Sequence, residues 1–134
     1  MPCPTIRSFR LSKNVLYYWF PVLALCTALF IQSSYPSIDT GLSWPLQDKL
    51  AHMIAYGVLA ALFYRAGHAT WPGRFSASQL FWMSVLFAGL YGMSDELHQA
   101  FVPTRQADVY DLLADLIGSF IGAAGYGGWI LRNR

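Results

Sequence analysis

Four long apolar stretches follow one another along the chain, and short connections containing proline or charged residues separate them. The stretches cover residues 14–32, 50–66, 78–94 and 109–131. A helix needs about 20 mostly apolar residues to cross a hydrocarbon core of about 30 Å. None of the stretches shows the alternation that a membrane β-barrel strand requires. The pattern therefore predicts an all-α integral membrane four-helix bundle, with helices near 14–32, 50–66, 78–101 and 109–131.

The composition supports a membrane protein of one domain. Only 12% of the 134 residues are charged and 55% are hydrophobic, whereas soluble domains carry about 25% charged residues. The first apolar stretch is longer than that of a signal peptide, and no Ala-x-Ala cleavage site follows it. We therefore expect a retained first helix and a single membrane domain over residues 1–134, with the lipid bilayer as its principal partner.

The charges are segregated between the two sides of this predicted bundle. All seven acidic residues fall on one side, together with Lys49 and Arg105. The other basic residues fall on the opposite side: Arg7, Arg10, Lys13, Arg65, Arg74, Arg132 and Arg134. The positive-inside rule then predicts that both termini are cytoplasmic. Loops this poor in lysine and arginine also argue against a nucleic-acid partner.

The start of the second predicted helix carries the first group of polar side chains on the outer side. Asp48, His52 and Tyr56 are four residues apart, so a helix places them along one stripe. Asp48 alone could instead cap the helix N-terminus. His52 lies about 6 Å deeper by helical rise, and Lys49 adds a cation beside Asp48.

The end of the third predicted helix carries the second group. Tyr91, Asp95, His98 and Gln99 share one helical face, whereas Glu96 is turned about 100° away from it. Arg105 follows in the next connection. Taken alone, this stretch could also be an ordinary solvated helix end.

The third group begins just before the fourth helix at Asp108. Asp111, Asp115, Gly118 and Gly122 fall on one face within about 60°. Glycines four residues apart allow another helix to approach closely. An acid near mid-helix costs up to about 3 kcal/mol in lipid, so Asp115 should face the bundle interior. Its expected partners are His52, His98 or Arg105.

These three segments resemble the VanZ-like family of small bacterial membrane proteins. The motifs are Asp48-Lys49-x-x-His52-x-x-x-Tyr56, Asp95-Glu96-x-His98-Gln99-x-Phe101-x-Pro103-x-Arg105 and Asp108-x-x-Asp111-x-x-x-Asp115-x-x-Gly118. Thr104 and Asp115 depart from the glycine and asparagine that are frequent in the family. The resemblance implies a multi-pass protein of the bacterial plasma membrane, in a cell-envelope family named for a member linked to teicoplanin resistance. It implies no particular mechanism, and it leaves the cofactor unknown.

The favoured hypothesis is a site that binds, and could modify, an anionic lipid-linked or glycopeptide-related group, such as an envelope precursor. Catalytic candidates are His52, Glu96 and His98. Binding candidates are Asp48, Lys49, Tyr56, Asp95, Gln99, Arg105, Asp108, Asp111 and Asp115. Lys49 and Arg105 would hold the anion.

Three alternatives remain open, and so does the question of whether the protein is an enzyme. The cluster could be a structural polar knot that locks the helices together. It could be a divalent metal site of His52, His98, Glu96 and an aspartate, although no His-Glu-x-x-His spacing is present. A proton relay is disfavoured, because the polar residues crowd at one mouth of the bundle.

Overall fold

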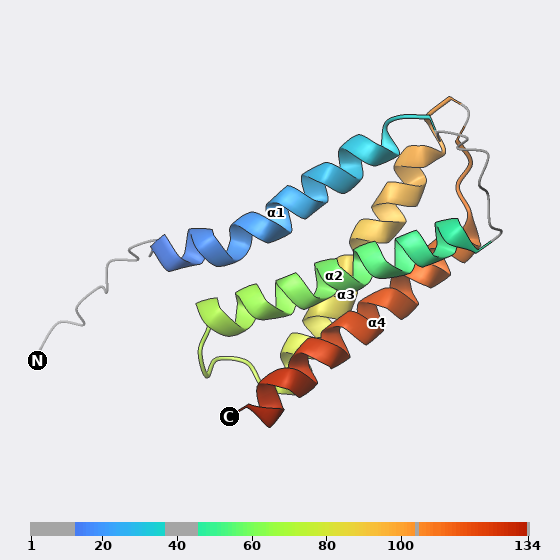
Figure 1. Cartoon of the computed structure of the whole chain (residues 1–134). Helices are drawn as coiled ribbons and strands as arrows, with labels where there is room; N and C mark the ends of the chain where they lie inside the picture. The colour runs from blue at the N-terminus through green and yellow to red at the C-terminus, as the bar shows by residue number, and fades with distance from the viewer. Residues whose placement is uncertain (1–12, 37–45, 104, 134) are drawn as a thin grey trace, which may run out of the picture.

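Four α-helices make up the part of the chain that the computed structural model describes, which is residues 13–36, 46–103 and 105–133. They are α1 (Lys13–Ser33), α2 (Gln47–Thr70), α3 (Ala77–Gln99) and α4 (Val109–Arg132) (Figure 1). No strand occurs within these ranges, which confirms the all-α prediction with four helices.

The helix bounds follow from local chemistry that hydrophobicity alone does not capture. α2 begins three residues before the apolar stretch 50–66 and continues four residues beyond it. A capping box opens α3, because Ser76 and Gln79 exchange side-chain and backbone hydrogen bonds. Asp108 caps α4 by accepting a hydrogen bond from the Tyr110 backbone N–H. α3 ends two residues before the expected position 101.

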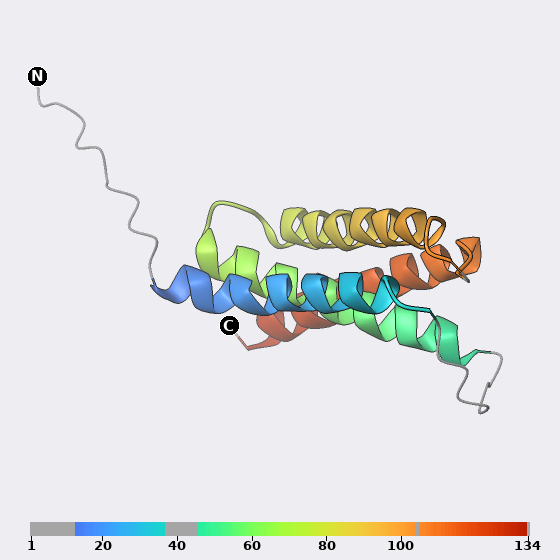
Figure 2. The same cartoon turned by 90° about the horizontal axis from the view of Figure 1, so that it is seen from above.

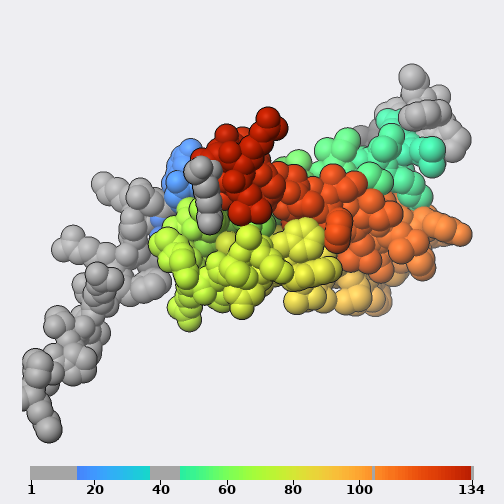
Figure 3. All heavy atoms as spheres, turned by 90° about the horizontal axis from the view of Figure 1, so that it is seen from below, coloured from blue at the N-terminus to red at the C-terminus, as the bar shows by residue number. Residues whose placement is uncertain are grey.

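Successive helices run in opposite directions, which brings the predicted polar segments together. The C-terminal ends of α1 and α3 lie at the same end of the molecule as the N-terminal ends of α2 and α4 (Figures 1 and 2). We call this the polar end, defined by Asp48, His52, Asp95, Glu96 and Asp111. Figure 3 shows α3 and α4 side by side on one face of the molecule.

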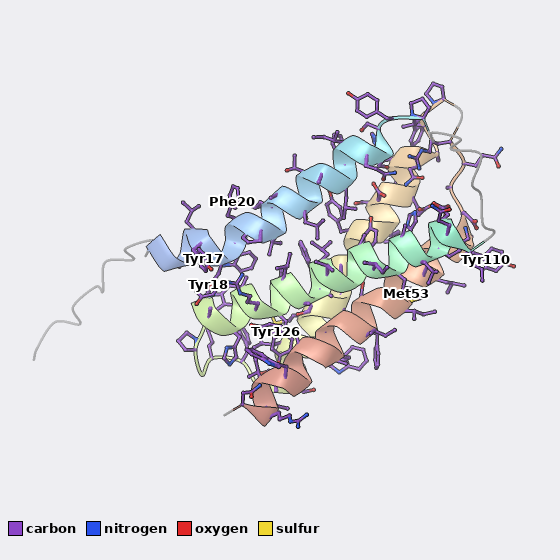
Figure 4. All side chains as sticks on the ribbon, viewed as in Figure 1. Tyr17, Tyr18, Phe20, Met53, Tyr110 and Tyr126 are labelled. Atoms are coloured by element: carbon purple, nitrogen blue, oxygen red, sulfur yellow. The ribbon has the colours of Figure 1, made fainter. Side chains whose placement is uncertain are left out.

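The closest helix contact joins α2 and α4 at glycines. A Cβ atom added to Gly118 would overlap the Met53 carbonyl oxygen, and one added to Gly122 would overlap the Gly57 carbonyl oxygen. Met53, labelled in Figure 4, belongs to the part of α2 that runs against α4. The prediction that these α4 glycines permit close approach of another helix is therefore confirmed, and the partner helix is α2.

Large apolar side chains remain exposed along every helix. Examples are Phe20 and Leu23 on α1, Leu86 on α3 and Ile121 on α4, each 58% to 65% exposed; Phe20 points away from the bundle in Figure 4. Two helices, α1 over Val15–Ser33 and α2 over Gln47–Thr70, are long and apolar enough to cross a membrane. Four membrane crossings therefore remain a prediction.

Candidate functional site

The α2 stripe is formed as the sequence predicted. Asp48, His52 and Tyr56 all line one cavity, and the His52 and Tyr56 rings stack with centroids 6.2 Å apart and planes 10° from parallel. Asp48 lies in the first turn of α2, but the N-cap position is Leu46 and no side chain caps this helix. Asp48 is therefore not the N-cap residue, but it is the acidic residue of the first turn, where a carboxylate favours the positive end of the helix dipole. Its carboxylate also lies near ligand atoms of His52 and Asp111.

His52 and Asp115 form the deepest polar contact between α2 and α4. His52 Nδ1 lies 2.9 Å from Asp115 Oδ1, and Asp115 is fully buried. Gly92 on α3 makes room for this carboxylate, because a Cβ atom there would lie 2.6 Å from Asp115 Oδ2. Of the three expected partners of Asp115, the structure selects His52.

Lys49 is fully engaged by the two outer aspartates. Its Nζ lies 2.5 Å from Asp108 Oδ2 and 2.5 Å from Asp111 Oδ1. The ammonium group of Lys49 and the Tyr110 backbone N–H lower the pKa of Asp108. Lys49 therefore ties α2 to the start of α4, and its charge is already compensated by two carboxylates.

This contact predicts a pH-dependent stability that Lys49→Gln should reduce. Because the pKa of Asp108 is lower in the folded protein, its contribution is present above the ordinary value of 3.8. That contribution is lost as the pH falls through the lowered value. We expect the thermal midpoint in detergent to fall less steeply with acidification in Lys49→Gln than in the wild type. Identical pH profiles would contradict the role assigned to Lys49.

Glu96 lies inside the polar cluster and His98 lies outside it, which is the reverse of what helical periodicity predicts. Glu96, expected to be turned away, is only 6% exposed, and its Oε2 accepts a hydrogen bond from the Asp108 backbone N–H at 2.8 Å. His98 Nε2 lies 3.1 Å from Ser34 Oγ, and its ring packs against Phe30 of α1. Glu96 joins the cluster because α4 packs against α3 on that side, whereas His98 faces α1.

Asp95, Gln99 and Arg105 form a chain of hydrogen bonds that leads to the end of α1. Gln99 Nε2 donates to Asp95 Oδ2 at 3.1 Å, and Arg105 Nη1 donates to Gln99 Oε1 at 3.4 Å. Arg105 also donates to the backbone carbonyls of Gln32 and Tyr35, at 3.2 and 3.0 Å. Among the residues that the structure describes, no carboxylate pairs with Arg105.

A cavity of about 290 Å³ opens at the polar end between α1, α2 and α3. Its lining residues are Leu29, Gln32, Asp48, Ala51, His52, Ala55, Tyr56 and Asp95. Leu29 and Gln32 show that α1 forms part of the cavity wall. Sequence reasoning missed them because Gln32 reads as the last residue of an apolar stretch, and its place in a cavity wall depends on packing.

Four buried side-chain oxygens have no hydrogen-bond partner in the described part of the chain. They are Ser33 Oγ, the Tyr56 hydroxyl, Glu96 Oε1 and Asp115 Oδ2. A buried polar atom without a partner carries a desolvation cost of about 1–3 kcal/mol. Their concentration at one end of the bundle indicates a site suited to a further ligand.

Comparison with known proteins agrees with the motif-based resemblance. The chain is 30% identical over 119 residues to an uncharacterized protein of the yeast Schizosaccharomyces pombe. The match covers 88% of this chain but only 65% of the length of that curated relative. No solved structure matches the chain. A family model for VanZ/LLP1 matches residues 5–132, nearly the whole sequence, and the chain therefore belongs to the VanZ/LLP1 family.

Proposed function

We propose that this protein is a multi-pass membrane protein that binds the anionic headgroup of a lipid-associated molecule at its polar end. The proposal includes one membrane domain over residues 1–134, four membrane crossings, cytoplasmic termini and a plasma-membrane location. The bacterial origin of this membrane is proposed from the motif resemblance alone, because the matched relative comes from a yeast. The observation that carries the binding proposal is the cavity between α1, α2 and α3.

The distribution of exposed side chains supports the membrane part of this proposal. Apolar side chains are exposed along all four helices, including the acid-bearing α3 and α4. An apolar groove of about 320 Å³ follows α3 and α4, lined by residues such as Leu86, Leu90 and Leu116. Exposed apolar side chains along all four helices are typical of a surface that contacts a membrane, where lipid tails would cover them.

The cavity has the character expected of a headgroup site. Its volume is close to the lower limit of about 300 Å³ for small-molecule pockets. Leu29, Ala51 and Ala55 form an apolar wall, whereas Asp48 and Asp95 supply acceptors for hydroxyl or amine donors of a headgroup. An amphiphile would match this change from apolar to polar lining.

Arg105 is the proposed anion contact, and Lys49 is not. Arg105 is held at the cavity rim through Gln32, which lines the cavity, and through Gln99, which bonds the cavity residue Asp95. Its planar guanidinium can bind a phosphate or carboxylate with two parallel hydrogen bonds. The charge of Lys49 is already compensated by Asp108 and Asp111. The sequence suggested that both Lys49 and Arg105 hold the anion, and the proposal now keeps only Arg105.

Lipid binding can be measured by native mass spectrometry of the protein in mild detergent. We expect phosphatidic acid and phosphatidylglycerol to form one-to-one adducts that phosphatidylcholine does not form. Arg105→Gln should weaken these adducts about tenfold, which corresponds to about 1.4 kcal/mol for a lost charged contact. Arg132→Gln is the matched control, because Arg132 is exposed at the C-terminal end of α4. Equal loss in both variants would show only a general charge effect and would defeat the proposal.

The orientation can be tested separately with single cysteines and a membrane-impermeant thiol reagent. Cys3 and Cys26 are first replaced by serine, and cysteine is then introduced for Ala107 or Pro72. Ala107 lies in the connection before α4, and Pro72 lies between α2 and α3. We expect labelling of the cysteine at 107, and not of that at 72, in intact cells. The reverse pattern would place the polar end in the cytoplasm.

The structural polar knot remains the second candidate, and the buried His52–Asp115 contact favours it. The two candidates differ in what Arg105→Gln changes. Arg105→Gln removes hydrogen bonds to Gln32, Tyr35 and Gln99, so some loss of stability is expected in either case. A knot predicts this loss with no lipid specificity to lose, whereas a headgroup site predicts weaker lipid adducts as well.

A further inference from the structure

The cluster of His52, Glu96 and Asp115 brings together three groups from three different helices. One potential ligand atom of each lies within 4.8 Å of one from each of the others. These residues are separated by at least 19 positions along the chain, so helix packing alone assembles them. Imidazole nitrogen and carboxylate oxygen are common ligands of zinc and related divalent ions.

Burial distinguishes this cluster from an ordinary group of surface acids. Glu96 is 6% exposed and Asp115 is fully buried, and each has one carboxylate oxygen with no hydrogen-bond partner within residues 13–36, 46–103 and 105–133. Burying a charged group costs several kcal/mol, and His52, even when protonated, could compensate only one of these two carboxylates. Lys49, which could supply positive charge, is instead engaged by Asp108 and Asp111. A cation bound close to His52 would therefore partner both oxygens and compensate the remaining negative charge.

We propose that His52, Glu96 and Asp115 form a binding site for one divalent transition-metal ion such as Zn²⁺ or Mn²⁺. Zinc bonds to nitrogen and oxygen of about 2.0–2.1 Å place tetrahedral ligands about 3.4 Å apart, so side-chain movements of about 1 Å would close the cluster. His52 Nδ1 and Asp115 Oδ1 are already 2.9 Å apart. Of the four ligands expected from the sequence, His52, Glu96 and an aspartate come together here, whereas His98 faces α1.

A neighbouring group of Asp48, His52 and Asp111 meets the same distance criterion but is a poorer site. Asp48 is exposed, and Asp111 is already paired with Lys49. His52 is shared by both groups, and the buried triad holds the unpartnered oxygens. The proposal is therefore confined to the triad and does not depend on which molecule fills the adjacent cavity.

The site can be tested by stripping the detergent-solubilised protein with EDTA and titrating it with Zn²⁺ and Mn²⁺ by calorimetry. We expect one ion per chain and a raised thermal midpoint of the wild type on metal addition. Glu96→Gln and His52→Gln should weaken binding by about 100-fold or more, because even outer-shell partners of metal ligands contribute about 10- to 100-fold.

Asp95→Asn is the matched control, because Asp95 precedes Glu96 on α3 and is equally buried at 6% exposure. It should weaken metal binding far less than Glu96→Gln does, because Asp95 acts on Asp115 only through its charge. Arg105→Gln, which tests the lipid site alone, should keep wild-type metal affinity. The metal-dependent rise in the thermal midpoint is measured on the wild type, so this test does not depend on whether any variant folds. Absence of that rise, or equal affinity in Glu96→Gln and the wild type, would overturn the metal site and leave the lipid proposal standing.

Discussion

Gly118→Ala should lower the free energy of unfolding by more than the addition of one methyl group ordinarily does. The new Cβ would overlap the Met53 carbonyl oxygen, and backbone cannot rotate aside as a side chain can. Overpacking costs about 1–3 kcal/mol in ordinary cores, so we expect a loss near 3 kcal/mol here. Unfolding in a mixed-micelle SDS titration, followed by tryptophan fluorescence, would measure it.

Gly125→Ala is the matched control on the same helix. No atom lies within 4 Å of a Cβ atom at Gly125, and alanine is preferred over glycine in helices by about 0.5–1 kcal/mol. This variant should therefore be as stable as the wild type or more stable. If Gly118→Ala and Gly125→Ala unfolded at the same SDS fraction, the close contact between α2 and α4 would not contribute to stability.

Replacing His52 by leucine should cause the second large effect. Asp115 would keep its fully buried position but lose His52, the one hydrogen-bond partner of its side chain among the residues that the structure describes. Removing one member of a buried ion pair typically costs about 3–5 kcal/mol. The measurement should be made in EDTA, so that any loss of bound metal does not add to the difference.

A double variant separates the cost of an isolated carboxylate from the cost of altered packing. His52→Leu combined with Asp115→Leu removes both polar groups, and apolar replacement of a complete buried pair is often neutral. We expect the double variant to be more stable than His52→Leu alone. Additive losses would show instead that the two side chains contribute independently.

Much of the architecture could be predicted because it depends on properties that lie along the chain. Apolar length determines where helices form, and their alternating direction brings the three polar segments to one end. The four-residue spacing of Asp48, His52 and Tyr56 is a property of one helix, so their common face could also be predicted. The spacing of Gly118 and Gly122 likewise predicted a close helix contact, but it did not identify α2 as the partner helix.

The membership of the site could not be derived in this way. Helical periodicity relates residues within α3, but it does not specify which sides of α3 are covered. α4 covers the side that carries Glu96, and α1 covers the side that carries His98. Two residues only two positions apart therefore lie in different environments.

The sequence by itself thus determined the helices, their order and the end at which the polar residues gather. Only the tertiary structure decided that Asp115 pairs with His52, that Lys49 is engaged by Asp108 and Asp111, and that α1 lines the cavity. The physical reason is that a hydrophobic pattern and helical spacing act locally, whereas a polar contact depends on the rotation and separation of helices from distant parts of the chain.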